Sequence, residues 1–251
     1  EMLLPIEEVI SNDEKIQIND INEIYVNSVR YLYPSTVISA IDYVDLRINV
    51  GSTIGFIGPS GAGKSTLIDI ILGLLKPTKG KILVNGIDIQ NNLRAWQDHI
   101  GYVPQSIYLT DDTLRKNIAF GIPEEMIDDK AIEDAISQSQ IQEFVQNLPE
   151  NDNTMVGENG VRLSGGQRQR IGIARALYHN PSILVFDEAT SALDSVIEKD
   201  VMETIDSLHG DKTIIIIAHR ISTLKNCDRI YKLNKGAIVE QGDYSQMVDF
   251  A

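Results

Sequence analysis

The chain carries, within its first hundred residues, the stretch Gly58-Pro59-Ser60-Gly61-Ala62-Gly63-Lys64-Ser65-Thr66. It follows a short apolar strand pattern at residues 54–57 and precedes a segment that we expect to be helical over residues 64–75. Glycines let a backbone wrap closely around an anion, and the N–H groups at a helix start supply positive potential. The stretch therefore predicts a loop that binds the phosphates of a nucleoside triphosphate, with Lys64 on the β- and γ-phosphates and the Ser65 hydroxyl on Mg²⁺.

Strand and helix patterns extend this unit in both directions. Unbroken apolar runs at 183–186 and 213–218, alternating with helices, predict a parallel sheet covered on both faces. Before residue 54, short β-prone runs predict an antiparallel sheet; they lie at 15–18, 25–29 and 46–48. From about 106 to 166, amphipathic helices replace the strands. The predicted fold is α/β: a P-loop NTPase core with a mostly parallel sheet, an N-terminal antiparallel β subdomain and an inserted α-helical subdomain.

Helix signals recur in the second half of the chain. We expect helices at 165–178 and 196–208, the first opened by a capping box of Ser164 and Gln167, and the second by one of Ser195 and Glu198. Inside the predicted helical subdomain, one helical face carries four apolar residues, Ile141, Phe144, Val145 and Leu148.

Composition limits the possible functions. The 251 residues hold 22 Lys and Arg against 36 Asp and Glu, for a net charge of −14. That balance disfavours nucleic acid as a partner, because such binding depends on cationic side chains. The single cysteine, Cys227, indicates a reducing compartment. We find no stretch long enough to span a membrane and read residues 1–15 as a linker, which leaves residues 16–251 as one domain.

Two adjacent acids, Asp187 and Glu188, follow the apolar run at 183–186. In open parallel α/β sheets, ligands bind at the carboxyl ends of the strands. We expect Asp187 to hold Mg²⁺ through water and Glu188 to act as the general base on an attacking water, which is typically worth about 10²–10⁴ in rate.

A second glycine-rich helix start follows the predicted helical subdomain, in Leu163-Ser164-Gly165-Gly166-Gln167. Such a start also exposes N–H groups to an anion. A chain with a single nucleotide-binding loop does not require a second phosphate-binding surface for its own nucleotide. We therefore expect residues 164–167 to face the nucleotide held by another subunit.

From about residue 16 to residue 243 the sequence resembles the nucleotide-binding domain of ATP-binding cassette (ABC) transporters. Residues 163–167 match that family's signature letter for letter, and the motifs keep the family's order. These motifs are the phosphate-binding loop, Gln105 after a strand, the signature, the paired acids, Ser191-Ala192-Leu193-Asp194, and His219. The resemblance implies a head-to-tail homodimer that closes around two ATP molecules with Mg²⁺.

The resemblance also implies roles for single residues. Gln105 would sense Mg²⁺ and the γ-phosphate, Asp194 would communicate across the dimer, and His219 would contact the γ-phosphate near Glu188. Tyr33 falls where the family places an aromatic ring against adenine, with Tyr31 as the competing residue. We interpret His99, His179 and His209 as surface or structural residues, and Arg168, Arg170 and Arg175 as ion-pair partners.

Residues 153–160, just before the signature, resemble a segment typical of exporter-type members, and Glu158 is our candidate for contact with a membrane domain. The implied function is an ATPase that powers export or flipping of a substrate, at the cytoplasmic face of the cell (inner) membrane. Its implied partner is a transmembrane domain, expected in the same polypeptide. Two alternatives remain: a separate ATPase subunit of an importer, and a non-transport ABC ATPase, which the lack of a long coiled coil disfavours.

Overall fold

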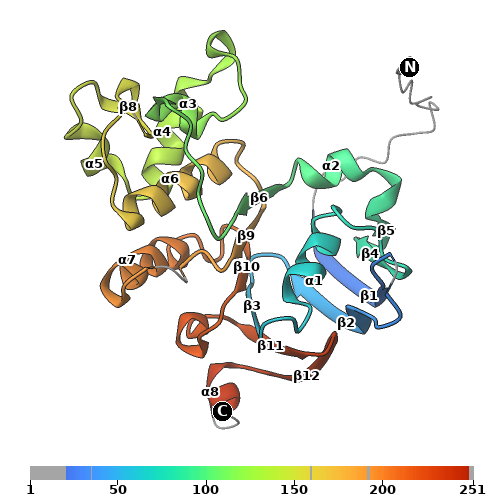
Figure 1. The fold of residues 1–251 in the computed structure, drawn as a ribbon. Helices are drawn as coiled ribbons and strands as arrows, with labels where there is room; N and C mark the ends of the chain where they lie inside the picture. Colours follow the sequence, from blue (N-terminus) through green and yellow to red (C-terminus); the bar gives the residue numbers. More distant parts are fainter. Residues whose placement is uncertain (1–20, 35, 159, 191–192, 249–251) are drawn as a thin grey trace.

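The central layer is a six-stranded sheet in the order β12-β11-β3-β10-β9-β6 (Figure 1). The computed structural model describes residues 21–34, 36–158, 160–190 and 193–248. Neighbouring strands of this sheet are parallel except β11 and β12, which are antiparallel. The strands are Thr53–Ile57 (β3), Ile100–Val103 (β6), Ile183–Asp187 (β9), Thr213–Ile217 (β10), Arg229–Asn234 (β11) and Ala237–Gly242 (β12). The predicted mostly parallel sheet is confirmed.

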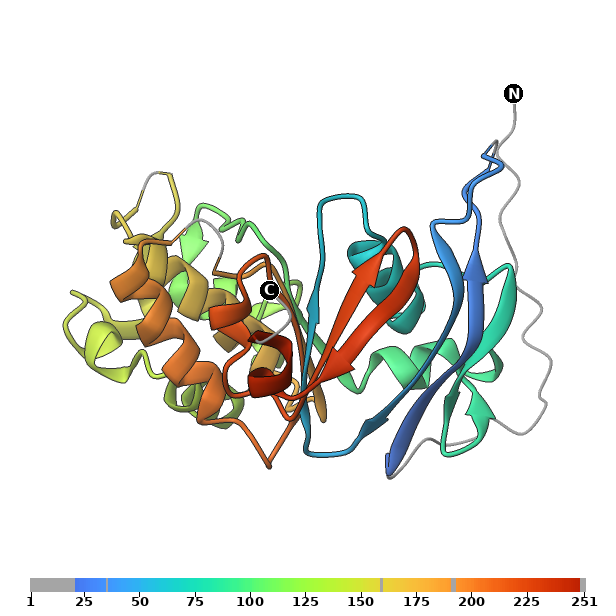
Figure 2. The same cartoon turned by 90° about the horizontal axis from the view of Figure 1, so that it is seen from below.

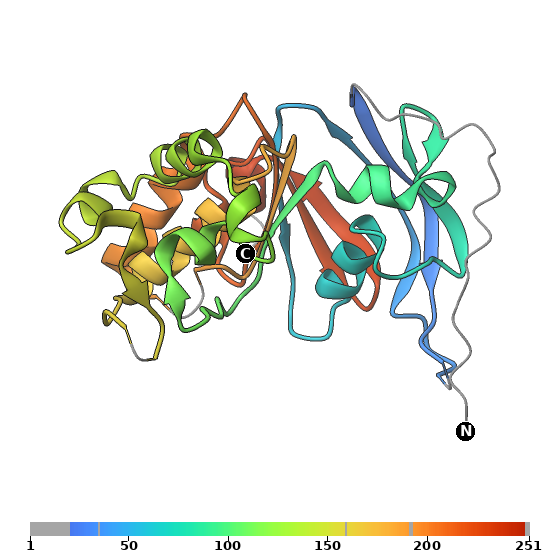
Figure 3. The same cartoon turned by 90° about the horizontal axis from the view of Figure 1, so that it is seen from above.

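Alternating residues of β9 point into two separate hydrophobic cores, one on each face of the central sheet. Leu184 and Phe186 of β9 are buried among the helices on one face, whereas Ile183 and Val185 are buried in the core on the other face. Because strand side chains alternate in direction, a continuous apolar run is what a strand covered on both faces requires. Figures 2 and 3 show the resulting layers, with helices on one side of the central sheet and a second sheet on the other.

The second sheet is four-stranded, in the order β2-β1-β4-β5, and its described neighbours pair antiparallel. Its strands are Glu23–Tyr31 (β1), Ile41–Asn49 (β2), Lys79–Val84 (β4) and Ile87–Asp88 (β5). The antiparallel sheet is confirmed, but β4 and β5 come after the phosphate-binding loop and were not predicted. The helix α1, Lys64–Ile71, packs between the two sheets within the same core (Figure 2).

The helical side of the molecule is built mainly by residues 114–206. Its α-helices are Leu114–Ile118 (α3), Asp129–Gln138 (α4), Gln142–Gln146 (α5), Gly165–Leu177 (α6) and Ser195–Asp206 (α7). Its 3₁₀ turns are Glu124–Met126 and Asn151–Asn153, and a small antiparallel ladder joins Asp112–Thr113 (β7) to Met155–Val156 (β8). The apolar face predicted around α5 is confirmed, since Ile141 and Val145 are buried and Phe144 and Leu148 pack against them.

The remaining helices lie around the central sheet. They are the α-helices Leu93–Gln97 (α2) and Tyr244–Val248 (α8) and the 3₁₀ turns Ile89–Asn91 (η1) and Ile221–Leu224 (η4). No helix in the described part of the chain has both the length and the apolar character needed to cross a membrane. The expected linker 1–15, the strand at 15–18, Ser191 and Ala192 lie outside the described residues.

The predicted end of α1 was wrong. We expected this helix to reach residue 75, but it ends at Ile71 because Gly73 adopts φ 74° in the left-handed region that favours glycine. The Leu74 N–H then turns back to the Asp69 carbonyl, 2.8 Å away.

The predicted cap of α7 was also wrong. We expected Ser195 and Glu198 to form a capping box, but the N-cap is Asp194, whose carboxylate accepts from the N–H groups of Val196 and Ile197 at 3.1 and 3.0 Å. One carboxylate therefore satisfies two helix-start donors, and the Glu198 side chain makes other contacts.

Candidate functional site

The phosphate-binding loop lines an open pocket of about 360 Å³. The pocket brings together three segments that are far apart in the sequence: the loop itself, the turn between β1 and β2, and the ends of β9 and β10. Its lining residues are Tyr33, Ala40, Ser60, Gly61, Ala62, Gly63, Lys64, Ser65, Thr66, Glu188 and His219. The structure thus brings Tyr33, Glu188 and His219 to the loop, as the sequence predicted.

The local geometry of the loop explains its glycines. Gly63 is the N-cap of α1 at φ 103°, and a side chain there would meet the Ala40 carbonyl oxygen at 2.6 Å. No side chain in the described part of the protein caps α1, which leaves the N–H groups of its first turn as donors for an anion. These features fit a phosphate group.

The Lys64 side chain is buried at the base of the loop. Its ammonium donates to the carbonyls of Gly58 at 2.8 Å and Pro59 at 3.3 Å. An ammonium has three donors, so these two bonds hold Lys64 in the loop and leave one N–H for a phosphate.

Tyr33 is tied to the loop helix. Its hydroxyl lies 3.0 Å from the Thr66 hydroxyl, and the residue is 42% exposed and lines the pocket. Tyr31 instead packs against the core between the sheets and meets the Tyr33 ring edge-on. The geometry therefore favours Tyr33 over Tyr31 for contact with a base.

Asp187 and Glu188 lie where β9 ends, beside the loop. The Tyr102 hydroxyl donates to Asp187 Oδ2 at 3.2 Å. Burial raises the pKa of Asp187, the Tyr102 bond lowers it, and the neighbouring Glu188 raises it. Burial and the Asp187 charge likewise raise the pKa of Tyr102, so this phenol stays a donor.

Glu188 and His219 form a direct pair, with His219 Nε2 2.7 Å from Glu188 Oε1. The Glu188 side chain is 14% exposed and its backbone has φ 51°, an uncommon conformation for a residue other than glycine. Its N–H donates to the Ile217 carbonyl on the adjacent strand at 3.1 Å. The carboxylate is thus fixed at the pocket wall, where it can accept a proton from water.

The oxygen donors here suit a hard cation. Ser65 contributes a hydroxyl and Asp187 a carboxylate, the ligand types that Mg²⁺ takes together with water and substrate phosphates. Among the described residues no cluster of three or more His, Cys, Asp or Glu side chains is arranged to hold a metal. The residues present therefore fit a Mg²⁺ that is shared with a phosphate ligand.

Gln105 and Asp194 are not among the described residues that line this pocket. Gln105 is exposed and follows β6, whose Val103 pairs with Phe186 of β9. It therefore lies at the same end of the sheet as Asp187. Asp194 is exposed and caps α7.

The predicted capping box at the start of α6 is confirmed. The Ser164 hydroxyl accepts from the Gln167 N–H at 3.2 Å, and the Gln167 side chain accepts from the Ser164 N–H at 2.9 Å. A side chain at Gly166 would meet Ile197 of α7 at 2.6 Å, so this glycine permits close helix packing. Ser164 and Gly165 are exposed, and residues 164–167 do not line the pocket of their own chain.

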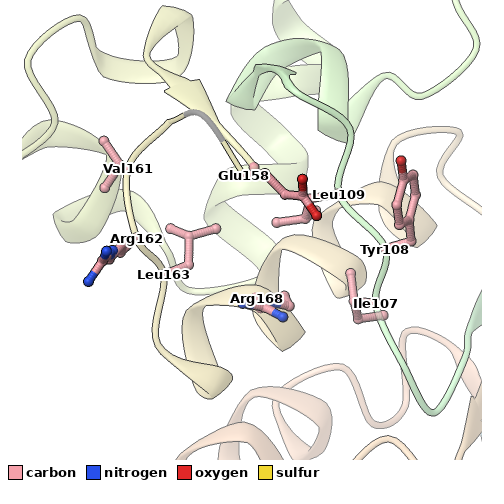
Figure 4. Close-up of a pocket in the computed structure, with 9 residues that line it drawn as sticks. Ile107, Tyr108, Leu109, Glu158, Val161, Arg162, Leu163 and Arg168 are labelled. Atoms are coloured by element: carbon pink, nitrogen blue, oxygen red, sulfur yellow. The ribbon is translucent and has the colours of Figure 1, made fainter.

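A second open pocket, of about 440 Å³, lies beside this helix (Figure 4). One wall is the segment after β6 with Ile107, Tyr108 and Leu109, and the other is the loop that carries Glu158. The two segments touch, since a side chain at Gly157 would meet the Thr110 carbonyl at 2.8 Å. We call this pocket, lined by residues 107–109, 157–158, 161–163 and 168, the helical groove.

Two of the three arginines that we expected to form ion pairs, Arg170 and Arg175, donate to backbone carbonyls instead. Arg175 donates to the carbonyls of Asn117 and Tyr108 at 2.8 and 2.9 Å, and Arg170 donates to the Asp200 carbonyl at 3.0 Å. Arg168 lines the helical groove. The expectation that Arg170 and Arg175 pair with carboxylates was wrong, because the backbone carbonyls of packed segments take their donors.

The other histidines lie apart from the phosphate-binding pocket, as expected. His99 contacts the Ser182 hydroxyl, and His209 contacts Thr53 and lies near Asp228. His179 packs its ring on Tyr178.

Comparison with known proteins agrees with this geometry. Residues 41–191 match the family model described as ABC transporter. The chain is 42% identical over 211 residues to an ATP-dependent lipid A-core flippase of Cupriavidus pinatubonensis, covering 83% of this chain and 36% of the flippase. It is 44% identical over 207 residues to the protein of that name from Francisella novicida, covering 82% and 35%.

A solved structure of a bacterial Atm1-family ABC exporter with ATP bound superposes with a TM-score of 0.81 at 35% identity, covering 92% of this chain and 40% of that one. The chain thus spans about a third of the length of the two flippases. The family match covers more than half of the chain and includes the loop residues 60–66 and Glu188 of the pocket, whereas Tyr33, Ala40 and His219 lie outside the matched range. The chain belongs to the ABC transporter family and is similar to the nucleotide-binding domains of its exporter-type members.

Proposed function

We propose that this domain binds Mg-ATP in the phosphate-binding pocket and hydrolyses it with Glu188 as the general base. The observation that carries the proposal is the Glu188–His219 pair, 2.7 Å apart on the wall of that pocket. Glu188 accepts the proton of an attacking water, and His219 holds the carboxylate in place. Bound Mg²⁺ would neutralise charge on the phosphates.

The remaining residues of the site bind the nucleotide. The N–H groups of residues 63–66 and the Lys64 ammonium face the β- and γ-phosphates, and the Tyr33 ring stacks on adenine. Ser65, Asp187 and Gln105 would hold Mg²⁺, directly or through water.

We also propose that two copies close head-to-tail around two nucleotides. Residues 164–167 are an intact helix start, yet they do not line their own chain's pocket. Facing a second copy, the exposed Ser164 and Gly165 would complete its phosphate site. Asp194, exposed at the start of α7, would lie at the same contact.

Closure of the two copies would drive a transmembrane domain, proposed to belong to the same polypeptide, at the cytoplasmic face of the membrane. One relative is named a flippase and the solved structure is that of an exporter, so we propose that this motion powers export or flipping of a substrate. The helical groove, with Glu158 and the exposed Tyr108, is the proposed docking surface for that domain. The nucleotide must bind the closed dimer more tightly than the open one, because only differential affinity shifts such an equilibrium.

The test is Glu188→Gln, which keeps the size of the side chain but removes the base. We expect Mg-ATP binding to persist, hydrolysis to fall about 10²–10⁴-fold, and a dimer to accumulate on sizing in Mg-ATP. Glu143→Gln, on the exposed surface of α5, is the matched control and should hydrolyse ATP normally. Unchanged hydrolysis in Glu188→Gln would remove Glu188 as the base, and full activity of a strict monomer would contradict the dimer.

A further inference from the structure

The carboxylate of Glu198 accepts hydrogen bonds from three side chains. Thr190 and Thr223 donate their hydroxyls to Oε1 at 3.2 and 2.9 Å, and Arg220 donates to Oε2 at 3.1 Å. The Glu198 side chain is 15% exposed. It lies in the first turn of α7, where the helix dipole favours a negative charge.

The three donors belong to the two segments that carry the Glu188–His219 pair. Thr190 is two residues after Glu188. Arg220 follows His219 directly, and Thr223 lies in the next turn, η4. Since Glu188 also contacts His219, these bonds and the backbone between them close a ring around a pocket of about 160 Å³, which all six residues line.

The helix cap leaves Glu198 available for this ring. A glutamate in the first turn of a helix often serves the N-terminus, but here Asp194 accepts from the helix N–H groups. The Glu198 side chain reaches across to the loops instead. Two hydroxyls and one guanidinium from the two loops converge on this one carboxylate, so Glu198 is suited to hold the two loops in one arrangement.

The Glu188–His219 pair needs such support. The His219 side chain is 45% exposed, so core packing alone does not hold it, and Glu188 has an uncommon φ of 51° that the surrounding contacts must maintain. A displacement of about 1 Å at a reacting group can cost about 10²-fold in rate.

We propose that Glu198 is a positioning residue that fixes Glu188 against His219 by bonding the loop after each of them. The inference rests on the proposed role of Glu188 as general base. In this proposal α7, which lies on the helical side of the central sheet, carries the residue that aligns the general base Glu188.

The experiment compares Glu198→Ala and Glu198→Gln in steady-state Mg-ATP hydrolysis by the purified protein. Alanine removes all three bonds and should lower kcat about 10- to 100-fold, with KM and nucleotide affinity unchanged. Glutamine keeps an oxygen for the two threonine hydroxyls and should restore most of the rate. The matched control is Glu203→Gln on the same helix, where the side chain is 62% exposed and pairs only weakly with Lys199 at 3.7 Å; it should behave as the unaltered protein.

A second variant covers the case in which Glu198→Ala does not fold. Thr190→Val with Thr223→Val keeps the branched shapes and removes only the two hydroxyls. It should lower kcat in the same way, with KM and the melting temperature close to those of the unaltered protein.

The proposal is overturned if folded Glu198→Ala or the double valine variant keeps its kcat, if KM rises while kcat holds, or if glutamine restores no more activity than alanine. Glu188→Gln distinguishes a failure of the proposed function from a failure of the positioning role. If it hydrolyses ATP normally, the proposed function fails; if it is inactive while Glu198→Ala is fully active, only the positioning role fails.

Discussion

His219 Nε2 lies 2.7 Å from Glu188 Oε1, although the two residues follow different strands. The contact exists because β9 and β10 are parallel neighbours with Asp187 opposite Ile217. Both strands therefore end at the same edge of the sheet, and the residues that follow them meet beside the phosphate-binding loop.

Replacing His219 by alanine should release the Glu188 carboxylate from its fixed orientation. We expect kcat for Mg-ATP hydrolysis to fall about 10²-fold, while nucleotide binding to the loop persists. The measurement is hydrolysis alongside nucleotide binding. His179→Ala, an exposed ring on Tyr178, is the control and should hydrolyse ATP at the normal rate. A fully active His219→Ala would show that Glu188 is held without the imidazole.

Ser164 can be tested for its two roles separately. Ser164→Ala removes the acceptor of the Gln167 N–H and should cost about 1 kcal/mol of stability in urea unfolding. Ser164→Asp keeps a good N-cap but places a negative charge where a partner's phosphate would lie.

We therefore expect Ser164→Asp to match the stability of the unaltered protein, yet to lose both hydrolysis and the dimer formed in Mg-ATP. Normal hydrolysis by this variant would argue against completion of the site by a second copy.

Trp96 should contribute strongly to the stability of the loop helix. It is fully buried, and its indole N–H donates to the Ile71 carbonyl at the end of α1, 2.7 Å away. Trp96→Phe removes that donor and leaves a cavity, so the free energy of unfolding should fall by about 2 kcal/mol or more. Tyr108→Phe, whose side chain is 74% exposed, is the control and should change unfolding by less than about 0.5 kcal/mol.

Cys227 should be unreactive in the folded protein. Burial, with the charges of Asp206 and Asp228, raises the pKa of its thiol from 9.0 to about 12. Maleimide labelling at pH 8 should therefore be slow in the native protein and fast in urea, with Cys227→Ser as the blank. Rapid native labelling would contradict the burial of this thiol.

The raised pKa of Cys227 also makes the stability of the folded protein depend on pH in the alkaline range. The unfolded thiol loses its proton near pH 9 and the folded one only near pH 12. The contribution of Cys227 is therefore present below pH 9 and is lost as the pH rises from 9 to 12.

Local patterns in the sequence predicted part of this site. The glycine-rich turn before α1 and the Ser164–Gln167 capping box were predicted correctly, because each depends on residues within a few positions of one another. The end of α1 was missed because Gly73 stops the helix before residue 75. The cap of α7 was misassigned because Asp194 and Ser195 are both good N-cap residues.

The sequence by itself determined which chemical groups are present and how each local segment begins, because helix starts, glycine turns and buried strands follow from neighbouring residues. Only the tertiary structure decided which groups meet. The Glu188–His219 contact, the Tyr33–Thr66 bond and the bonds from Arg220 and Thr223 to Glu198 join residues distant in the chain. Their proximity is fixed by the order and register of the strands and by how α7 packs beside them, which no local pattern encodes.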